Sequence, residues 1–377
     1  MWDRQNRPRI YPAFLPHAGC PYRCVYCNQY AVTGGSGGRE GSDLLRGRAA
    51  IEDRAERSRR SGIPGEIAFY GGTFTALPEA LLDGLLEAAA AGVRDGVFTG
   101  IRFSTRPDAV SEDTVRRLQA FPIRTVELGA QSLSDAVLLA SRRGYRAAAV
   151  EAAARRVRAA GWALGIQLMV GLPGETPSRF QGTISKAVAL RPDFVRLYPA
   201  LVLRDTGLAR WFESGRYRPL SLDQAVERCA FAFDRFLKNG IRVARMGLHA
   251  DPELDRPGTI LAGPCHPAFG YLVRVRWWRN RVDAVMEGRA KTPAPPEGGD
   301  AVALPDGSAP IRSRNQRSAV LHVPSNLLSE ALGPRRENVT YWTRKWGWDG
   351  LDVRPEASAA VEGRNGRLCV GDEEFHL

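Results

Sequence analysis

Short β-like runs alternate with amphipathic helical stretches through the first 250 residues of this 377-residue chain. Such alternation predicts βαβ units and a parallel sheet. Six or seven units fit a partial or complete barrel better than a flat sheet, and in such barrels the functional groups gather at the carboxyl ends of the strands. The predicted strands are Ile10–Pro16, Glu66–Tyr70, Gly100–Thr105, Thr125–Ala130, Leu164–Val170, Phe194–Pro199 and, as a further candidate, Ile241–Gly247.

The stretches between these strands carry apolar residues at three- and four-residue spacing, which is typical of helices that bury one face. Two of them begin with capping signals, at Ser111 and at Ser221. The predicted helices are Pro78–Ala91, Ser111–Ala120, Ala147–Ala160, Pro177–Leu190 and Leu222–Leu237.

The alternation stops near residue 250. Residues 1–250 are therefore predicted to form an α/β domain, a partial (β/α)6 TIM-like barrel, and residues 251–377 a smaller C-terminal α/β appendage. Residues 292–310 are rich in proline, glycine and alanine, which indicates a linker. A β-like run, Ser318–Val323, and a short helix, Asn326–Leu332, are expected after it.

Composition limits the partners of such a chain. No apolar run approaches the roughly 20 residues that cross a bilayer, and the N-terminus lacks a secretory signal pattern, so a cytoplasmic protein without a membrane partner is expected. The formal net charge of +12 is compatible with an RNA partner, but only four of the 53 basic residues are lysines. Because GC-rich coding sequence also produces an arginine bias, the charge alone does not establish RNA binding.

Three of the six cysteines, Cys20, Cys24 and Cys27, fall within eight residues at C-x3-C-x2-C spacing, just after the first predicted strand. Thiolates are the natural ligands of iron–sulfur clusters, and three of them leave one iron of a [4Fe–4S] cubane open. The alternative is a zinc site with His17 as fourth ligand. Zinc sites usually add a second cysteine pair further on, which this sequence does not have, so the spacing favours the cluster.

Glycines and polar residues mark the ends of the next strands. Two adjacent glycines let a backbone approach a ligand closely, although such a turn is more often only a tight loop. Each polar residue, taken singly, also fits a helix cap or a sheet end. These residues are Gly71, Gly72 and Thr73 after the second strand, Ser104 on the third, Gln131 on the fourth, Arg143 twelve residues beyond it, and Gln167 on the fifth.

Together, these motifs resemble the radical S-adenosylmethionine (SAM) superfamily. The cysteine loop matches its CxxxCxxC signature, with Tyr26 before the third cysteine. The order of the strand-end motifs is similar to the branch that contains oxygen-independent coproporphyrinogen oxidase and the Elongator catalytic subunit. The resemblance implies that Cys20, Cys24 and Cys27 hold a [4Fe–4S] cluster that cleaves SAM to a 5′-deoxyadenosyl radical, with an electron donor such as flavodoxin or ferredoxin.

The resemblance also implies roles for the strand-end residues. Tyr26 would stack on adenine, the Gly71–Thr73 turn would hold the methionine amino group, and Gln131 and Arg143 would contact SAM, Arg143 through its carboxylate. Thr73 stands where the family has glutamate. Ser104 and Gln167 stand where the coproporphyrinogen branch has acidic residues, so contacts to the nucleoside are expected to differ.

The segment from Arg196 to Leu208, with Gly215-Arg216-Tyr217 after it, is similar to a stretch of the Elongator catalytic subunit. Nothing in the sequence resembles an acetyltransferase domain. The chain is therefore identified as similar to stand-alone bacterial radical SAM proteins related to Elongator, which implies tRNA modification. Two alternatives are a radical SAM enzyme that acts on a small molecule or peptide, and a non-catalytic heme-binding chaperone of the same fold.

Two further segments have open interpretations. Cys265 and His266, with His249, would suit an auxiliary metal site or a hydrogen donor, but a buried turn is the simpler interpretation. The segments Arg274–Arg279 and Tyr341–Trp346 interleave cations with aromatic residues. Such segments stack and neutralise RNA when exposed, and form core when buried.

Overall fold

The computed structural model describes residues 9–21, 23–29, 40–248, 254, 256–291, 318–356, 366–371 and 373–377. They divide into two compact units, residues 3–269 and residues 270–377. The linker predicted at 292–310 and His249 lie outside the described residues. The N-terminal unit thus continues about twenty residues beyond the predicted boundary at 250.

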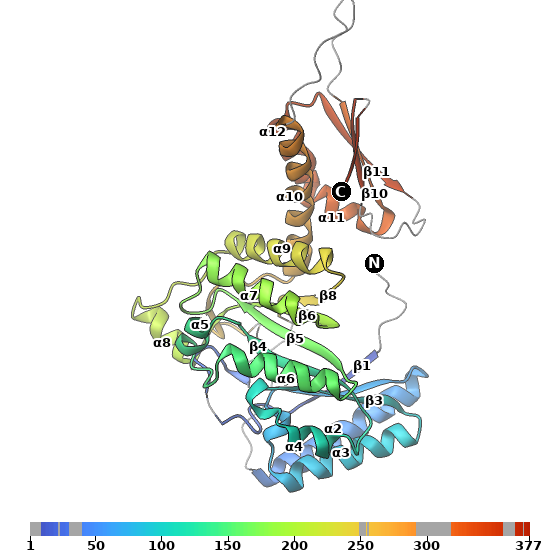
Figure 1. Cartoon of the computed structure of the whole chain (residues 1–377), viewed down its shortest axis with the longest axis vertical. Helices are drawn as coiled ribbons and strands as arrows, with labels where there is room; N and C mark the ends of the chain where they lie inside the picture. The colour runs from blue at the N-terminus through green and yellow to red at the C-terminus, as the bar shows by residue number, and fades with distance from the viewer. Residues whose placement is uncertain are drawn as a thin grey trace, which may run out of the picture. The chain divides into compact units, whose positions relative to one another are not determined.

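The N-terminal unit is built on a curled, seven-stranded parallel sheet, which confirms the predicted α/β half-barrel (Figure 1). The spatial order β1-β2-β3-β4-β5-β6-β8 nearly follows the chain, as repeated βαβ units require. The strands are β1 (Arg9–Phe14), β2 (Gly65–Tyr70), β3 (Phe98–Thr105), β4 (Ile123–Gln131), β5 (Ala163–Val170), β6 (Phe194–Pro199) and β8 (Arg242–Met246).

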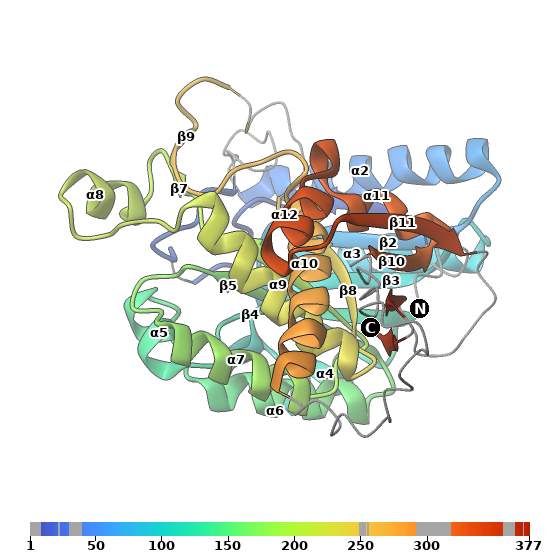
Figure 2. The same ribbon diagram turned by 90° about the horizontal axis from the view of Figure 1, so that it is seen from above.

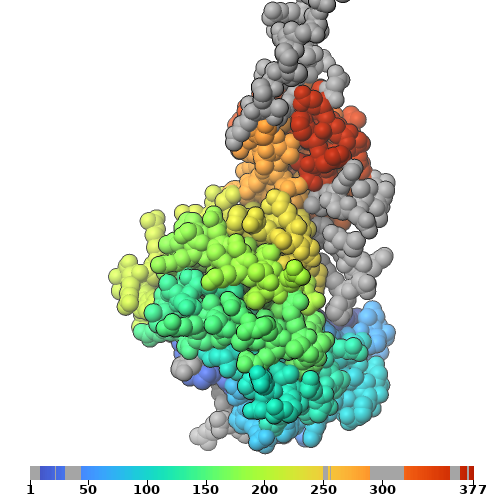
Figure 3. Space-filling view, in the orientation of Figure 1, coloured from blue at the N-terminus to red at the C-terminus, as the bar shows by residue number. Residues whose placement is uncertain are grey.

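Helices cover one face of this sheet (Figures 1 and 2), and their side chains form a continuous surface over it in the space-filling view (Figure 3). The predicted caps are present: Ser111 accepts from the backbone N–H of Thr114, and Ser221 forms a capping box with Gln224. The helices are α2 (Glu40–Ser61), α3 (Glu79–Arg94), α4 (Glu112–Leu118), α5 (Asp135–Ala140), α6 (Ala147–Ala159), α7 (Pro177–Ala189), α8 (Gly207–Glu213) and α9 (Leu222–Lys238), with the 3-10 turns η1 (Phe74–Ala76) and η2 (Pro107–Ala109).

A short antiparallel pair, β7 (Val202–Leu203) with β9 (Ile260–Ala262), lies beyond the end of β6. Leu201, Leu203 and Leu254 form a small buried cluster beside it. Strands of two and three residues are too short to give an alternating pattern, so the sequence did not predict them.

The other face of the sheet is unusually polar. Side chains alternate between the two faces of a strand, so Ile67, Phe103 and Leu128 lie on the helix-covered face while Arg102 and Glu127 lie on the opposite one. All five are buried. The inside of the half-barrel therefore contains charges away from water, which is tolerated only where they are paired.

Glu127 on β4 is the centre of this polar interior. Its carboxylate accepts hydrogen bonds from Tyr70 Oη at 2.7 Å, Arg102 Nη1 at 2.9 Å, Arg196 Nε at 2.7 Å and Gln167 Nε2 at 3.1 Å. Burial alone would raise the pKa of the Glu127 carboxyl, but the guanidinium groups of Arg196 and Arg102 hold it below its ordinary value. One carboxylate thus links β2, β3, β4, β5 and β6.

A second carboxylate extends the network. Glu66 on β2 accepts from Arg102 Nε at 2.6 Å and from Thr125 Oγ1 at 2.8 Å. Arg102 is therefore shared between the two buried carboxylates of Glu66 and Glu127. Each charged side chain of this network has a partner of opposite charge.

Replacement of Glu127 by glutamine should lower the free energy of unfolding by about 3 kcal/mol, because two buried guanidinium groups lose the charge that offsets their desolvation. Urea denaturation measures the change. The corresponding carboxylate-to-amide substitution in an exposed pair, Asp113→Asn opposite Arg116, should lower the free energy of unfolding by less than about 1 kcal/mol. Equal effects at the two sites would show that the interior network is not a major source of stability.

The C-terminal unit has a four-stranded sheet in the order β11-β10-β12-β13. β10 pairs in parallel with β11 and antiparallel with β12. The predicted run at Ser318–Val323 and the helix near Asn326–Leu332 are confirmed. The elements are α10 (Phe269–Lys291), β10 (Ser318–Pro324), η3 (Ser325–Leu327), α11 (Leu328–Leu332), η4 (Pro334–Arg336), α12 (Glu337–Trp346), β11 (Gly350–Glu356), β12 (Arg367–Val370) and β13 (Glu373–His376).

The aromatic–cationic segments of this unit form its core and internal ion pairs. Trp277, Trp278 and Trp342 are buried. Asp283 accepts hydrogen bonds from Tyr341 Oη at 2.7 Å, from Lys345 Nζ at 2.6 Å and from Trp346 Nε1 at 3.0 Å. The interpretation of these segments as an exposed RNA-stacking surface is therefore wrong for the tryptophans that α10 and α12 bury.

Candidate cofactor site

The cysteine loop follows β1 and is docked, backbone to backbone, on the turn after β2. The N–H of Thr73 donates to the carbonyl oxygen of Ala18 at 2.8 Å. A Cβ on Gly72 would overlap that same carbonyl oxygen, and a Cβ on Gly19 (φ 69°) would overlap the carbonyl oxygen of Thr73. Only glycine permits this approach, so the Gly71-Gly72 turn holds the loop in place.

Each cysteine of the loop has its own polar partner. Cys20 Sγ lies 3.2 Å from Thr73 Oγ1, Arg143 Nη1 donates to Cys24 Sγ at 3.0 Å, and Gln29 Nε2 donates to Cys27 Sγ at 3.7 Å. These contacts bring Thr73 and Arg143, which were predicted as site residues, directly onto the loop.

The three thiols of the loop are partly or fully withdrawn from water. Burial raises the pKa of Cys20, and burial together with the charges of Cys24 and Cys20 raises the pKa of Cys27 to about 12. A metal centre that binds thiolates must therefore displace their protons. Among the described residues, no three acidic, histidine or cysteine side chains are arranged around a single ion. A [4Fe–4S] cubane binds each thiolate through a different iron, so its ligands need not converge on one point, and this donor set fits it.

His17, the alternative fourth ligand of a zinc site, makes a hydrogen bond within the cysteine loop. Its Nε2 accepts a hydrogen bond from the backbone N–H of Gln29 at 3.0 Å. Burial, with the nearby charge of Arg23, lowers the pKa of His17, which favours the neutral imidazole that can accept this bond. The imidazole thus closes the cysteine loop on itself.

Arg143 is a buried cation that contacts the cysteine loop. Besides Cys24, it donates to Tyr26 Oη at 3.2 Å, to the carbonyl oxygen of Gly129 at 2.6 Å and to Tyr145 Oη at 2.8 Å. Tyr145 in turn donates to the Gly129 carbonyl at 2.8 Å. The end of β4, the turn after α5 and the cysteine loop therefore meet at one guanidinium group.

Gln131 lies at the same strand end. Its backbone is left-handed (φ 64°). Its side-chain Nε2 lies next to Gly129, 3.1 Å from the position that a Cβ of residue 129 would occupy. The carbonyl of Gly129 is the one that Arg143 and Tyr145 share. The structure thus brings Gln131 and Arg143 to one place, as their separate positions in the sequence had suggested.

Ser104 and Gln167, the two residues that stand where the coproporphyrinogen branch has acidic side chains, have other surroundings. Ser104 and Gly72 line a cavity of about 10 Å3, the size of roughly one water molecule. Gln167 donates to Glu127 and is part of the half-barrel interior. Glu127 and Gln167 are forty residues apart on neighbouring strands, so no local pattern indicates that they form a pair.

A buried apolar cluster also holds the cysteine loop. Cys24, Val25 and Tyr26 pack in one buried cluster with Leu172 and Leu208. The N–H of Leu208 donates to the carbonyl oxygen of Val25 at 2.6 Å. The Elongator-like stretch from Arg196 to Leu208 thereby reaches the cysteine loop, a contact that the sequence did not predict.

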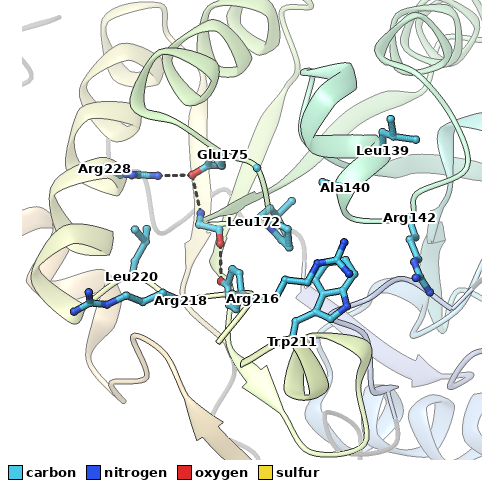
Figure 4. Close-up of a pocket in the computed structure, with 14 residues that line it drawn as sticks. Leu139, Ala140, Arg142, Leu172, Glu175, Trp211, Arg216, Arg218, Leu220 and Arg228 are labelled. Atoms are coloured by element: carbon cyan, nitrogen blue, oxygen red, sulfur yellow. Dashed lines mark hydrogen bonds and ion pairs between the residues drawn. The ribbon is translucent and has the colours of Figure 1, made fainter. Parts of the chain in front are cut away.

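A pocket of about 460 Å3 lies beyond the carboxyl end of β5, between α5, α8 and the start of α9 (Figure 4). Glu175 on its wall accepts from Arg228 at 2.7 Å and from the backbone N–H of Gly171 at 2.8 Å. Burial nevertheless raises the pKa of the Glu175 carboxyl to about 7. The side chain is only 3% exposed, so desolvation outweighs one ion pair and one hydrogen bond.

Glu175 should make stability depend on pH. A carboxyl whose pKa rises from 4.5 to about 7 on folding stabilises the fold fully below about pH 4.5, and this contribution is lost as the pH rises through 7. The free energy of unfolding of the native protein should fall by about 2 to 3 kcal/mol relative to that of Glu175→Gln between pH 5 and pH 8. Parallel pH curves for the two proteins, from denaturant titrations, would contradict this assignment.

The segment with Cys265 and His266 lies at the surface. Cys265 is exposed, and His266 Nδ1 accepts from the backbone N–H of Ala268 at 3.1 Å. The interpretation of this segment as a buried turn is therefore wrong. The remaining residue of that group, His249, is outside the described part of the chain.

Two family models match consecutive parts of the chain: the radical SAM superfamily over residues 14–187, and the radical SAM C-terminal domain over residues 192–279. The chain belongs to the radical SAM superfamily. It is an enzyme of that superfamily, whose members typically bind a [4Fe–4S] cluster and SAM. The cysteine loop, the Gly71-Gly72 turn, Arg143 and Glu127 fall within the first match, and Arg196, which pairs with Glu127, falls within the second.

Curated relatives include a tRNA uridine(34) acetyltransferase of Dehalococcoides mccartyi, 29% identical over 53% of this chain and 50% of that protein. Human Elongator complex protein 3 is 28% identical over 44% of this chain and 34% of its own length. The chain thus spans half or less of these relatives. Among solved structures, Methanocaldococcus infernus Elp3 with an N-terminal deletion superposes with a TM-score of 0.52 at 20% identity, over 74% of this chain and 63% of that one, which shows the shared fold.

No described helix has the length and apolar character to cross a membrane.

Proposed function

We propose that this enzyme holds a [4Fe–4S] cluster on Cys20, Cys24 and Cys27, cleaves SAM reductively, and uses the resulting radical to modify a tRNA base. The observation that carries the proposal is the position of the three thiols. They lie at the carboxyl ends of the parallel strands, fixed by the Gly71-Gly72 turn and next to a buried arginine. When bound there, the cluster supplies the electron that breaks the carbon–sulfur bond of SAM.

Arg143 is proposed to position the cofactors. A guanidinium group binds a carboxylate in two parallel hydrogen bonds, which suits the methionine end of SAM. Arg143 now donates to Cys24 Sγ and to the carbonyl oxygen of Gly129, so its fork already faces both the cysteine loop and the end of β4. Gln131, beside the same carbonyl, is proposed as a second polar contact to SAM.

Tyr26 and the turn after β2 are proposed to complete the SAM site. Tyr26 is proposed to offer its ring to adenine, and its hydroxyl is held by Arg143. Gly71, Gly72 and Thr73 would meet the methionine amino group through backbone groups and the Thr73 hydroxyl. Ser104 and Gln167 are proposed to contact the nucleoside, but Gln167 would then have to leave Glu127.

The proposal that the substrate is tRNA rests on the relatives and on the charge of the chain. Several relatives are tRNA uridine(34) acetyltransferases by name, and this chain carries a formal net charge of +12. A tRNA substrate implies a cytoplasmic site of action, and the reductant is proposed to be a low-potential flavodoxin or ferredoxin.

Cys24→Ala should abolish both the visible absorbance of the anaerobically reconstituted cluster and the release of 5′-deoxyadenosine from SAM under dithionite, because the cluster loses one of three thiolates. Liquid chromatography of the reaction measures the product. Cys265→Ala removes an exposed thiol outside the loop and should leave both signals at the native level. If Cys24→Ala retained the absorbance and the product, the assigned ligand set would be wrong.

Wild-type protein should bind unfractionated tRNA at low salt, and the affinity should fall as salt rises, because phosphate contacts release counterions. Filter binding between roughly 50 and 200 mM salt tests this. Absence of binding at the low-salt end would exclude the tRNA proposal while leaving SAM cleavage intact. A small molecule or peptide would then be the substrate class to test, by metabolite profiling of a deletion strain.

A further inference from the structure

The pocket beyond β5 has a rim of arginines. Arg142, Arg216 and Arg218 line it and are exposed. Within the described part of the chain, no carboxylate forms an ion pair with any of the three, whereas Arg228 on the wall is paired with Glu175. The rim therefore has positive charge that the protein itself does not neutralise.

Trp211 of α8 orders this charge. The guanidinium carbon of Arg216 lies 4.6 Å from the centre of the Trp211 ring, and that of Arg142 lies 5.7 Å from it. Figure 4 shows the Arg216 side chain over the indole, with Arg142 reaching toward it from the turn after α5. A cation held over an aromatic face keeps its N–H groups directed around the ring edge, so these two arginines are pre-organised to bind an anion.

The pocket adjoins the proposed radical site. Trp211 packs on the apolar cluster that contains Cys24 and Tyr26, and Tyr217, on the pocket wall, belongs to the same cluster. Arg142 directly precedes Arg143, which donates to Cys24 Sγ. The turn after α5 thus places one arginine on the pocket rim and the next one against the cysteine loop.

The pocket walls are partly apolar. Leu139, Leu172 and Pro173 line it together with Trp211. A volume of about 460 Å3 falls within the range of pockets that hold small ligands, about 300–1,000 Å3. The combination of apolar walls with a cationic, aromatic rim matches a ribose or base joined to phosphate, since bases stack on arginine and tryptophan planes.

We propose that this pocket is an RNA subsite. Arg142 and Arg216 bind successive phosphodiesters of the substrate strand, and the apolar wall with Trp211 receives the nucleoside between them, next to the nucleotide that the enzyme modifies. This inference rests on the proposed tRNA-modifying function and names the surface that serves it. Three cations along one rim exceed what a single phosphate needs, which favours a strand with successive phosphates over a free mononucleotide.

The test compares tRNA binding by full-length, reconstituted protein and by the double variant Arg142→Asn with Arg216→Ala. Asparagine is chosen at position 142 because the backbone there is left-handed (φ 53°). The matched control is Arg124→Ala, which removes an exposed arginine near the amino end of β4, the opposite end of the sheet. Unfolding transitions check that all variants are folded.

The double variant should bind unfractionated tRNA about tenfold more weakly near 0.1 M salt, and the slope of log affinity against log salt should decrease by about 1.5, because two phosphate contacts are lost. Arg218→Ala, on the same rim, should show a smaller loss in the same direction, and Arg124→Ala none. If the native protein binds tRNA and the double variant binds it with the same affinity and slope, the pocket is not the RNA subsite, although the proposed function stands. If the native protein does not bind tRNA, this inference fails together with the tRNA part of the proposed function, and the proposed cleavage of SAM is unaffected.

Competition identifies the source of the phosphate. Uridine 5′-monophosphate should displace tRNA only at concentrations far above those of a competing oligonucleotide. Displacement by the mononucleotide at equal concentration would assign the pocket to a free nucleotide. Displacement by an acidic peptide such as poly-glutamate, at a matched charge concentration, would assign it to a protein partner. Either result would overturn the RNA assignment.

Discussion

The half-barrel depends on the buried ion pairs that Glu127 forms with Arg102 and Arg196. A parallel sheet that curls around a polar interior must bury charges, and a buried charge without a partner costs several kcal/mol. Here one carboxylate accepts hydrogen bonds from four side chains on four other strands, and its pKa stays low. The sheet that carries the candidate cofactor site is therefore held by buried ion pairs on one face and by apolar packing under the helices on the other.

The features that were predictable from sequence are those with a local cause. The strands β1 to β6 and the caps at Ser111 and Ser221 follow from alternation and capping chemistry within a few residues. The cysteine loop and the Gly71-Gly72 turn were recognisable for the same reason. The meeting of Thr73, Gln131 and Arg143 followed from the general rule that parallel strands end at one edge. Contact of these residues with SAM is part of the proposed function.

The features that the sequence did not predict depend on contacts between distant segments. The partner of Gln167 is Glu127, one strand away, and nothing near either residue indicates the pair. The long helix α10 has apolar, aromatic and basic residues on every side, so no single stripe predicts it. The aromatic–cationic segments were ambiguous because burial decides their role. In the C-terminal unit residues of these segments are buried or paired with Asp283. Trp211 instead lines a pocket together with arginines.

The backbone contact between Gly19, Gly72 and the carbonyl groups opposite them has a consequence for engineering. Main-chain atoms set how closely the cysteine loop approaches the turn after β2. A library that randomises the exposed rim residues Arg142, Arg216 and Arg218, and retains Trp211 because it packs on the cluster that contains Cys24, therefore leaves this approach intact. The residues proposed to select the substrate and those proposed to hold the cofactors are therefore separable parts of the chain, and substrate variants can be explored while the two glycines are held constant.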